Sequence, residues 1–237
     1  MATSKNVAEI QRKHDSEALF TPVEAMDLVK SLSYAKFDES VDLVFYLGID
    51  SRHADQIVRG TVSFPHGTGK SIKVAVFAND QAKDAEAAGA DLVGGQDLAD
   101  RIISGDVPLD WDVTIATPDM MSVVGKLGQV LGPRGLMPNP KSGTVTNDVA
   151  KTVGEFKSGR VEYRNDRFGN VHVPAGRVSF DADKLVDNLV VIADEIARSR
   201  PASTKGIFIK KIAVSSTMGP GIKIDPSAMT DLIKARR

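Results

Sequence analysis

The chain has 237 residues, with 30 Lys and Arg against 31 Asp and Glu and a formal net charge of −1. This length fits one large domain or two modest ones, and the absence of cysteine excludes disulfides, thiolate metal sites and cysteine nucleophiles. An apolar fraction of 42% speaks against global disorder, and no apolar run approaches the ~20 residues of a membrane span, so we expect a cytoplasmic protein without a membrane partner.

The first 66 residues predict two helices followed by two strands. A short helix is expected up to about Asp15, and a second begins at Thr21, where the sequence Thr-Pro-Val-Glu is a capping box. Its buried face is expected to carry Val23, Met26, Val29 and Leu32. Alternating apolar residues predict strands over 40–47 and 56–64.

From residue 67 to 159 strands alternate with helices, which predicts a parallel sheet with helices on its faces. Strands are expected over 72–78, 91–93 and 113–116, and helices over 81–88, 96–104, after Thr117, and over 147–157 with Thr146 as cap. Five glycines and three prolines lie between Gly125 and Gly143, which predicts a long functional loop there.

The last third returns to the first pattern. Strands are expected over 160–164 and 170–175, with a charged turn over 165–169 between them, and over 207–215. Asp181 is expected to cap a long helix with one buried stripe, which consists of Leu185, Leu189, Ile192 and Ile196. A Gly/Pro turn follows over 216–221, and the tail is expected to fray. Periodicity leaves open whether these parts form two sequential domains or one domain interrupted by another.

Charge is unevenly distributed along the chain. Residues 67–159 carry nine Lys and Arg against twelve Asp and Glu, a net of −3, whereas the two flanks together carry a net of +2. Residues 196–224 contain six basic residues and no acid, and residues 120–147 are also free of acids. These stretches fit either a solvated face or a local field for an anionic partner.

Several short patterns suggest enzymes but lack the required spacing. The Gly-Lys-Ser at 69–71 would end a phosphate-binding loop, yet Phe64 stands where that loop needs glycine, and a strand rather than a helix follows. Asp50, Ser51 and His53 are neighbours in one loop, which seldom gives the geometry of a catalytic triad. The four scattered histidines show no metal-ligand spacing. No cofactor is expected.

Three loops combine residues suited to RNA. Thr217, Met218 and Gly219 offer a hydroxyl, an exposed apolar side chain and a close backbone approach, and Lys36 with Phe37 offers a cation beside an aromatic ring. The turn over 165–169 is charged. Each has an ordinary alternative: a strand-end turn, an aromatic that holds its loop on the core, and a hairpin turn.

Four long motifs in order resemble the bacterial large-subunit ribosomal protein L-one family, the stalk protein beside the tRNA exit site. They are VRGTVSFPHGTGK, GQVLGPRGLMPNPKSGTV, VEYRNDRFGNVH and STMGPG. The resemblance implies an α/β protein of two domains. Residues 1–66 and 160–237 would form a discontinuous two-layer rRNA-binding domain, and 67–159 an inserted three-layer Rossmann-like domain. The two crossings between them would act as a hinge.

The same resemblance implies a structural ribosomal protein rather than an enzyme, monomeric when free of the ribosome. Its partners would be the rRNA of the stalk, exit-site tRNA and its own operon mRNA, whose translation it would repress. The RNA-binding residues carried over by motif are Lys36, Phe37, Ser40, Arg164, Arg167, His172, Thr217, Met218 and Gly219, with Arg134 and Lys141 as further contacts in the inserted domain. The rival is a nucleotide-cofactor enzyme built on the strand–helix middle segment, which lacks a cofactor fingerprint.

Overall fold

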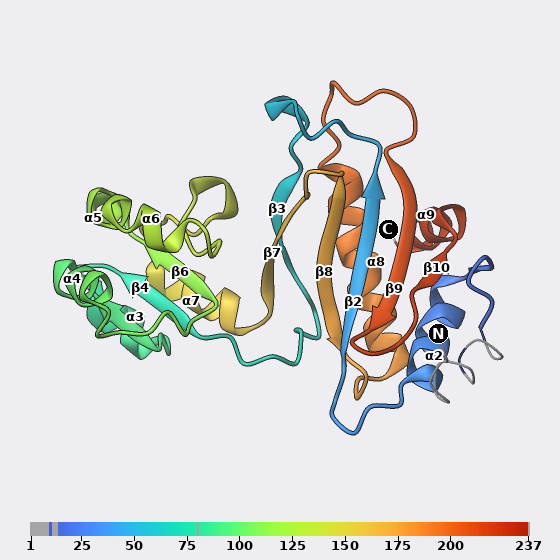
Figure 1. Ribbon diagram of the computed structural model, residues 1–237, viewed down its shortest axis with the longest axis horizontal. Coiled ribbons are helices and arrows are strands. Elements are labelled where there is room, and N and C mark those ends of the chain that lie inside the picture. The colour runs from blue at the N-terminus through green and yellow to red at the C-terminus, as the bar shows by residue number, and fades with distance from the viewer. Residues whose placement is uncertain (1–9, 11–13, 80, 237) are drawn as a thin grey trace, which may run out of the picture. The chain divides into compact units, whose positions relative to one another are not determined.

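The computed structural model describes residues 10, 14–79 and 81–236 of the chain. The expected helix before Asp15 lies almost wholly outside these residues. The chain forms two compact units, one made of Met1–Gly69 with Val161–Arg237 and the other of Lys70–Arg160 (Figure 1). The first unit is therefore assembled from both ends of the chain.

The first unit is built on a five-stranded sheet in the order β1-β10-β9-β2-β8. Its strands are β1 (Leu19–Phe20), β2 (Ser40–Leu47), β8 (Asn170–Arg177), β9 (Ile209–Ser216) and β10 (Ile222–Ile224). The central strand β2 is antiparallel to both neighbours, and the register joins Ser40 to Arg177 and Tyr46 to Lys211. Figure 1 shows β8, β2 and β9 side by side in this unit.

Three helices cover one face of this sheet and bury it. They are α2 (Pro22–Leu32), α8 (Ala182–Arg198) and α9 (Pro226–Ala235). Leu185, Leu189, Ile192 and Ile196 on α8 are fully buried, which confirms the predicted stripe. Val41, Leu43, Phe45 and Leu47 of β2 join the same core. The alternate residues of β2 are only partly buried, so the other face of the sheet is not covered by helices.

The remaining elements of the first unit are a short two-stranded sheet and one helical turn. β3 (Arg59–Ser63) pairs with β7 (Arg160–Arg164), and η1 (Ala54–Gln56) precedes β3. The expected strand over 56–64 is therefore shorter than predicted. The turn over 165–169 joins β7 to β8, which belong to different sheets, and an isolated antiparallel bridge between Asn165 and Val171 closes it in the manner of a hairpin turn.

The second unit has a parallel three-stranded sheet in the order β5-β4-β6 with helices on both faces. One core cluster joins the sheet to α4 and α5, and the other joins it to α3 and α7. The strands are β4 (Val74–Phe77), β5 (Leu92–Gly94) and β6 (Val113–Ala116), and the helical segments are α3 (Ala82–Ala87), α4 (Gln96–Ser104), η2 (Pro118–Met120), α5 (Met121–Lys126), α6 (Gly128–Leu131), η3 (Pro140–Ser142) and α7 (Val149–Lys157). The predicted α/β class is confirmed.

Several local predictions are wrong for identifiable reasons. Val23 is 46% exposed, because the buried face of α2 starts from Pro22 and passes through Ala25 instead. The segment 125–143 is not a continuous loop, since α6 forms where Leu127 and Leu131 are fully buried and tertiary packing outweighs the low helix propensity of glycine.

Two helix caps and the tail also differ from expectation. α7 is capped by Asp148, whose Oδ1 accepts from the backbone N–H of Lys151 at 3.3 Å, and not by Thr146. Asp181 occupies the cap position of α8, but its carboxylate makes no capping bond and pairs with Lys184 at 2.9 Å. The tail is helical through Ala235, because Asp225 caps α9 and Pro226 opens it.

Within the described residues, no helix combines the length and apolar character that a membrane crossing needs. The Gly67–Ser71 segment leads into β4, a strand, so it lacks the helix N-terminus of a phosphate-binding loop.

The packing of α8 on the sheet gives a direct test of the core. We expect Leu189→Ala to lower the free energy of unfolding by about 2–5 kcal/mol, because the side chain is fully buried and leaves a cavity. Val23→Ala should change it by less than about 0.5 kcal/mol. Hydrogen exchange of the β2 amides reports on this unit separately; equal effects of the two substitutions would contradict the packing.

Candidate RNA interface

A buried carboxylate joins two of the loops that the sequence selects for RNA. Glu39 is 0% exposed and lies directly before β2. Its Oε1 accepts hydrogen bonds from the hydroxyl of Ser33 at 2.7 Å and the backbone N–H of Ala35 at 3.1 Å. Its Oε2 accepts from the backbone N–H of Met218 at 2.9 Å. One side chain thus ties the loop before β2 to the turn after β9.

The charge of Glu39 is held by these bonds. Burial on its own would raise the pKa of this carboxyl, but the Met218 backbone, the Ser216 and Ser33 hydroxyls and the Ala35 backbone lower its pKa from 4.5 to about 2. The group is therefore a carboxylate at neutral pH. A carboxylate accepts at both oxygens, which is what two loops approaching from different sides require.

Thr217 adds a second tie between the same loops. Its Oγ1 accepts from the backbone N–H of Ser40 at 3.0 Å and lies 3.4 Å from the Ser40 carbonyl oxygen, to which it donates. The hydroxyl predicted to face RNA therefore holds the turn against the start of β2. We call residues 36–40 and 216–219 together the Glu39 rim.

The Glu39 rim presents large apolar side chains to solvent. Phe37 is 56% exposed and Met218 is 52% exposed, while Lys36 is also exposed. Phe37 thus does not hold its loop on the core, and the alternative considered from the sequence is wrong. Exposed apolar groups on loops that buried bonds fix in place are suited to contact sugar and base faces.

Gly219 lies close to the side chain of Ser216 in the turn. A Cβ at this position would lie 2.4 Å from Ser216 Oγ, closer than real Cβ atoms approach. Ser216 Oγ is buried and makes no hydrogen bond of standard geometry among the described residues, but it lies near enough to the Glu39 carboxylate to lower the pKa of that group. The sequence predicts that Gly219 allows a close approach by a partner, and the structure shows that the Ser216 side chain of the same turn already approaches it closely.

The uncovered face of the sheet runs from the Glu39 rim along β2 and its neighbours. His172 pairs with Val44 and is exposed, so it lies midway along this face. Asp42 lies on the same face, and burial raises the pKa of its carboxyl while the nearby His172 lowers it. A bulge at Lys210 places the Lys210 ammonium 5.2 Å from the centre of the Tyr46 ring.

The charged turn over 165–169 lies at the opposite end of the sheet. Asp166 accepts from the backbone N–H groups of Phe168 and Asn170, each at 2.8 Å, which shapes the turn. Arg164 and Arg167 are exposed, and the Arg167 guanidinium lies 4.8 Å from the Phe168 ring, which is itself 66% exposed. Phe168 is a candidate contact that the sequence analysis missed.

The register shows how far apart these groups are. Ser40 opens β2 at the Glu39 rim, whereas Tyr46 pairs with Asn170 next to the charged turn. Tyr46 comes six positions after Ser40 along the strand, which is a distance of about 20 Å. The predicted residues of this unit therefore form two clusters at the two ends of the sheet face, with His172 between them.

The two residues predicted in the inserted segment lie in the second unit. Arg134 is exposed, and its Nη1 donates to the backbone carbonyl of Leu109 at 3.2 Å. Lys141 lies in η3, and its side chain is outside the described part of the structure.

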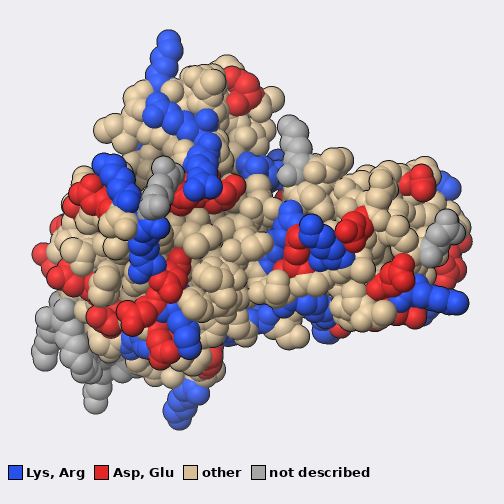
Figure 2. Space-filling view, turned by 180° about the vertical axis from the view of Figure 1, so that it is seen from behind, with Lys and Arg blue, Asp and Glu red and all other residues tan. Residues whose placement is uncertain are grey.

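The helix side of the first unit looks different. Figure 2, turned by 180° from Figure 1, shows Lys and Arg interspersed with Asp and Glu on that side. Several of the acids lie in ion pairs, such as Asp194 with Arg198 at 2.5 Å. The pairing leaves little field of one sign there, so the sheet face and its rim are the better RNA candidates. Among the described residues, no group of three or more His, Asp or Glu could hold a metal ion.

Comparison with known proteins shows the family to which the chain belongs. The model of the Ribosomal protein L1p/L10e family matches residues 29–220. The chain belongs to this family. A large ribosomal subunit protein uL1 from Thermobifida fusca is 52% identical over 99% of this chain and 100% of its own length. Another from Thermosipho africanus is 54% identical over 96% of this chain and 98% of its own.

Family membership confirms the resemblance found in the motifs. It also agrees with the prediction that the chain is not an enzyme, since the matching family is one of ribosomal proteins. Sequence reasoning missed Glu39, the residue that organises the rim. Its only signal was a carboxylate directly before a predicted strand, and nothing local indicates that its partners lie 6 and 179 residues away.

The depressed pKa of Glu39 predicts a specific acid sensitivity. Its contribution to stability is fully present above about pH 4.5 and is lost as the pH falls toward about 2, because the neutral acid cannot accept at both oxygens. We expect Glu39→Gln to cost about 1–3 kcal/mol at pH 7 and progressively less at lower pH. The Met218 amide should exchange faster in this variant.

Unfolding of both proteins from pH 7 to 2 measures this difference, with Asp231→Asn, an exposed carboxylate on α9, as the control. A constant difference between the wild type and Glu39→Gln across this range would contradict the role assigned to Glu39.

The turn predicts an unusual double-mutant result. Gly219→Ala should destabilise the unit by about 1–3 kcal/mol, because its Cβ collides with Ser216 Oγ. Adding Ser216→Ala removes that atom and leaves the Ser216 Cβ at an ordinary 3.5 Å, so the double variant should be more stable than Gly219→Ala alone. Additive losses in chemical unfolding would refute the proposed contact.

Proposed function

We propose that this chain binds a folded segment of large-subunit rRNA along the uncovered sheet face of its first unit. There it serves as the structural protein of the mobile stalk beside the tRNA exit site, within the large ribosomal subunit of the cytoplasm. The names of the uL1 relatives support the ribosomal assignment. The observation that carries the RNA site is the Glu39 rim, which holds Phe37 and Met218 exposed on two joined loops.

The rim is suited to recognise RNA shape. Phe37 and Met218 would cover ribose and base faces, and backbone groups of the two loops would meet hydroxyls and phosphates. Because Glu39 and Thr217 already fix both loops, little conformational entropy is lost on binding. Local fit is needed because the whole chain, with a net charge of −1, attracts RNA only weakly.

The second cluster extends the contact. An RNA segment that touches both the Glu39 rim and Arg164 or Arg167 must follow the strands for about 20 Å. His172 lies on this path, and Lys210 and Lys211 border it on β9. Asp42 is an acid on the same face, and burial raises the pKa of its carboxyl while the nearby His172 lowers it.

The same surface would serve regulation. A repressor of its own operon needs no second site if the mRNA presents a shape like that of the rRNA segment. Free chain would then bind mRNA only after the rRNA sites are filled, as a monomer on either RNA. Arg134 and Lys141 in the second unit are proposed as secondary contacts to rRNA or to exit-site tRNA.

Filter binding at fixed salt to a stalk rRNA fragment tests the site. We expect Phe37→Ala and Met218→Ala each to weaken binding about tenfold, because each removes an apolar contact of about 1–3 kcal/mol. Thr217→Ala should also weaken it, through the loss of its bonds to Ser40. Lys141→Ala should have a much smaller effect.

Ile103→Ala is the matched control, since Ile103 is 58% exposed on the second unit. Equal losses for Met218→Ala, Lys141→Ala and Ile103→Ala would overturn the site. Thermal stabilisation by ATP or NAD but not by the rRNA fragment would favour the cofactor-enzyme alternative.

A further inference from the structure

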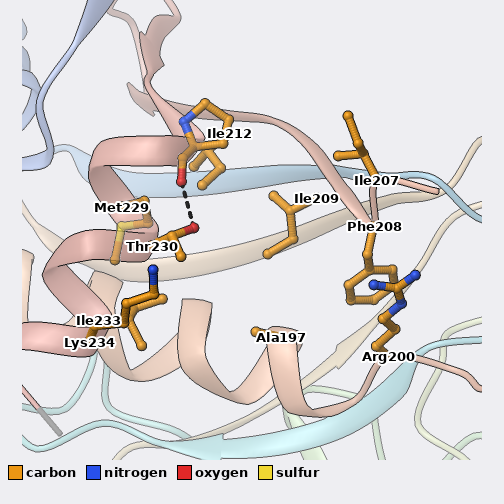
Figure 3. Close-up of a pocket in the computed structure, with 11 residues that line it drawn as sticks. Ala197, Arg200, Ile207, Phe208, Ile209, Ile212, Met229, Thr230, Ile233 and Lys234 are labelled. Atoms are coloured by element: carbon orange, nitrogen blue, oxygen red, sulfur yellow. Dashed lines mark hydrogen bonds between the residues drawn. The ribbon is translucent and has the colours of Figure 1, made fainter.

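The first unit contains an apolar pocket that the RNA interface does not use. It has a volume of ≈400 Å³ and lies between the end of α8, the segment 199–208, β9 and α9 (Figure 3). Its lining includes Ile212 and Met229, whose side chains belong to the helix-covered core. The pocket therefore opens on the side of the sheet opposite the RNA face.

The two charged residues of the lining are both cations. Arg200 and Lys234 lie at opposite ends of the pocket, with Ile209 and Ala197 between them (Figure 3). The Arg200 Nη2 donates to the carbonyls of Thr204 and Gly206 at 3.1 and 3.0 Å, which fixes the guanidinium and, within the part of the chain that the structure describes, leaves Nε and Nη1 to face a ligand. Lys234 is 71% exposed at its side chain and only loosely paired with Asp231 at 3.5 Å.

An unusually exposed apolar residue stands at the same pocket. Ile207 lines it and is 74% exposed, the largest exposed fraction among the described large apolar side chains. Lys205, also exposed, is two residues away. The acid-free basic run over 196–224, for which the sequence allows either a solvated face or a field for an anionic partner, supplies Arg200 and Ile207 to the pocket as well as Lys210 and Lys211 to the RNA face.

We propose that this pocket docks an acidic, apolar peptide segment of another protein. One or two large apolar side chains would fill the ≈400 Å³ and cover Ile207, and carboxylates on either side of them would pair with Arg200 and Lys234. A cation at each end of the pocket fits a ligand that has two separated anionic groups with an apolar centre between them. An amphiphile has a single charged headgroup and would pair with only one of the two cations.

Binding of a synthetic peptide tests this. The probe is a fluorescent peptide of about twelve residues in which Leu and Phe are flanked by Asp and Glu. We expect a dissociation constant of about 1–100 μM for this peptide. Lys234→Glu and Ile207→Ser should each raise this constant about tenfold. Both residues are exposed, so these variants should fold, and rRNA binding should be unchanged in both.

Matched controls come from the second unit. Lys126→Glu makes the same charge change, and Ile103→Ser removes an apolar residue of similar exposure. Equal weakening by the controls, or equal binding of a peptide with Ser in place of Leu and Phe, would overturn the proposal. So would displacement of the peptide by laurate at similar concentration, which would indicate an amphiphile, or by the rRNA fragment, which would place the pocket in the RNA interface.

Discussion

The RNA surface proposed for this protein depends on one buried carboxylate. Glu39 accepts hydrogen bonds from three groups on two segments, and without it the loop before β2 and the turn after β9 have little to join them beyond the Thr217 bonds. A buried charge is costly unless it is fully bonded. The same cost fixes the position of the two loops, because only one relative position gives hydrogen bonds to both carboxylate oxygens of Glu39.

The sheet converts this local order into a long surface. Helices on one face bury the odd residues of β2, which forces the even residues to the uncovered face, and the register then carries that face from the Glu39 rim to the charged turn. Because the two clusters of contacts lie at a fixed separation, only an RNA whose contacting groups have the matching spacing can reach both. Such a surface can select one folded RNA even though the protein has little net charge. The spacing of the contacts distinguishes this RNA from others, which electrostatic attraction alone does not do.

The sequence predicted what depends on nearby residues. The capping box at Thr21 and Glu24 forms as expected, with its two bonds at 3.1 and 3.4 Å, and so does the stripe on α8. It did not predict Glu39, because its partners come together only when the sheet forms. The pairing of β7 with β3, the helix α6 in a glycine-rich segment and the exposure of Val23 likewise depend on tertiary packing. Four long motifs nevertheless identified the family, since they report ancestry rather than local physics.

The strand order determines when the proposed RNA surface can form during synthesis of the chain. β2, the centre of the sheet, is made early, but both of its neighbours, β8 and β9, come from the last third of the chain. During synthesis the second unit, Lys70–Arg160, has all of its residues before the first unit does. The Glu39 rim closes only once Met218 has been added. A chain that has not yet reached Met218 therefore carries no finished RNA surface and would not count toward the occupancy of an RNA target.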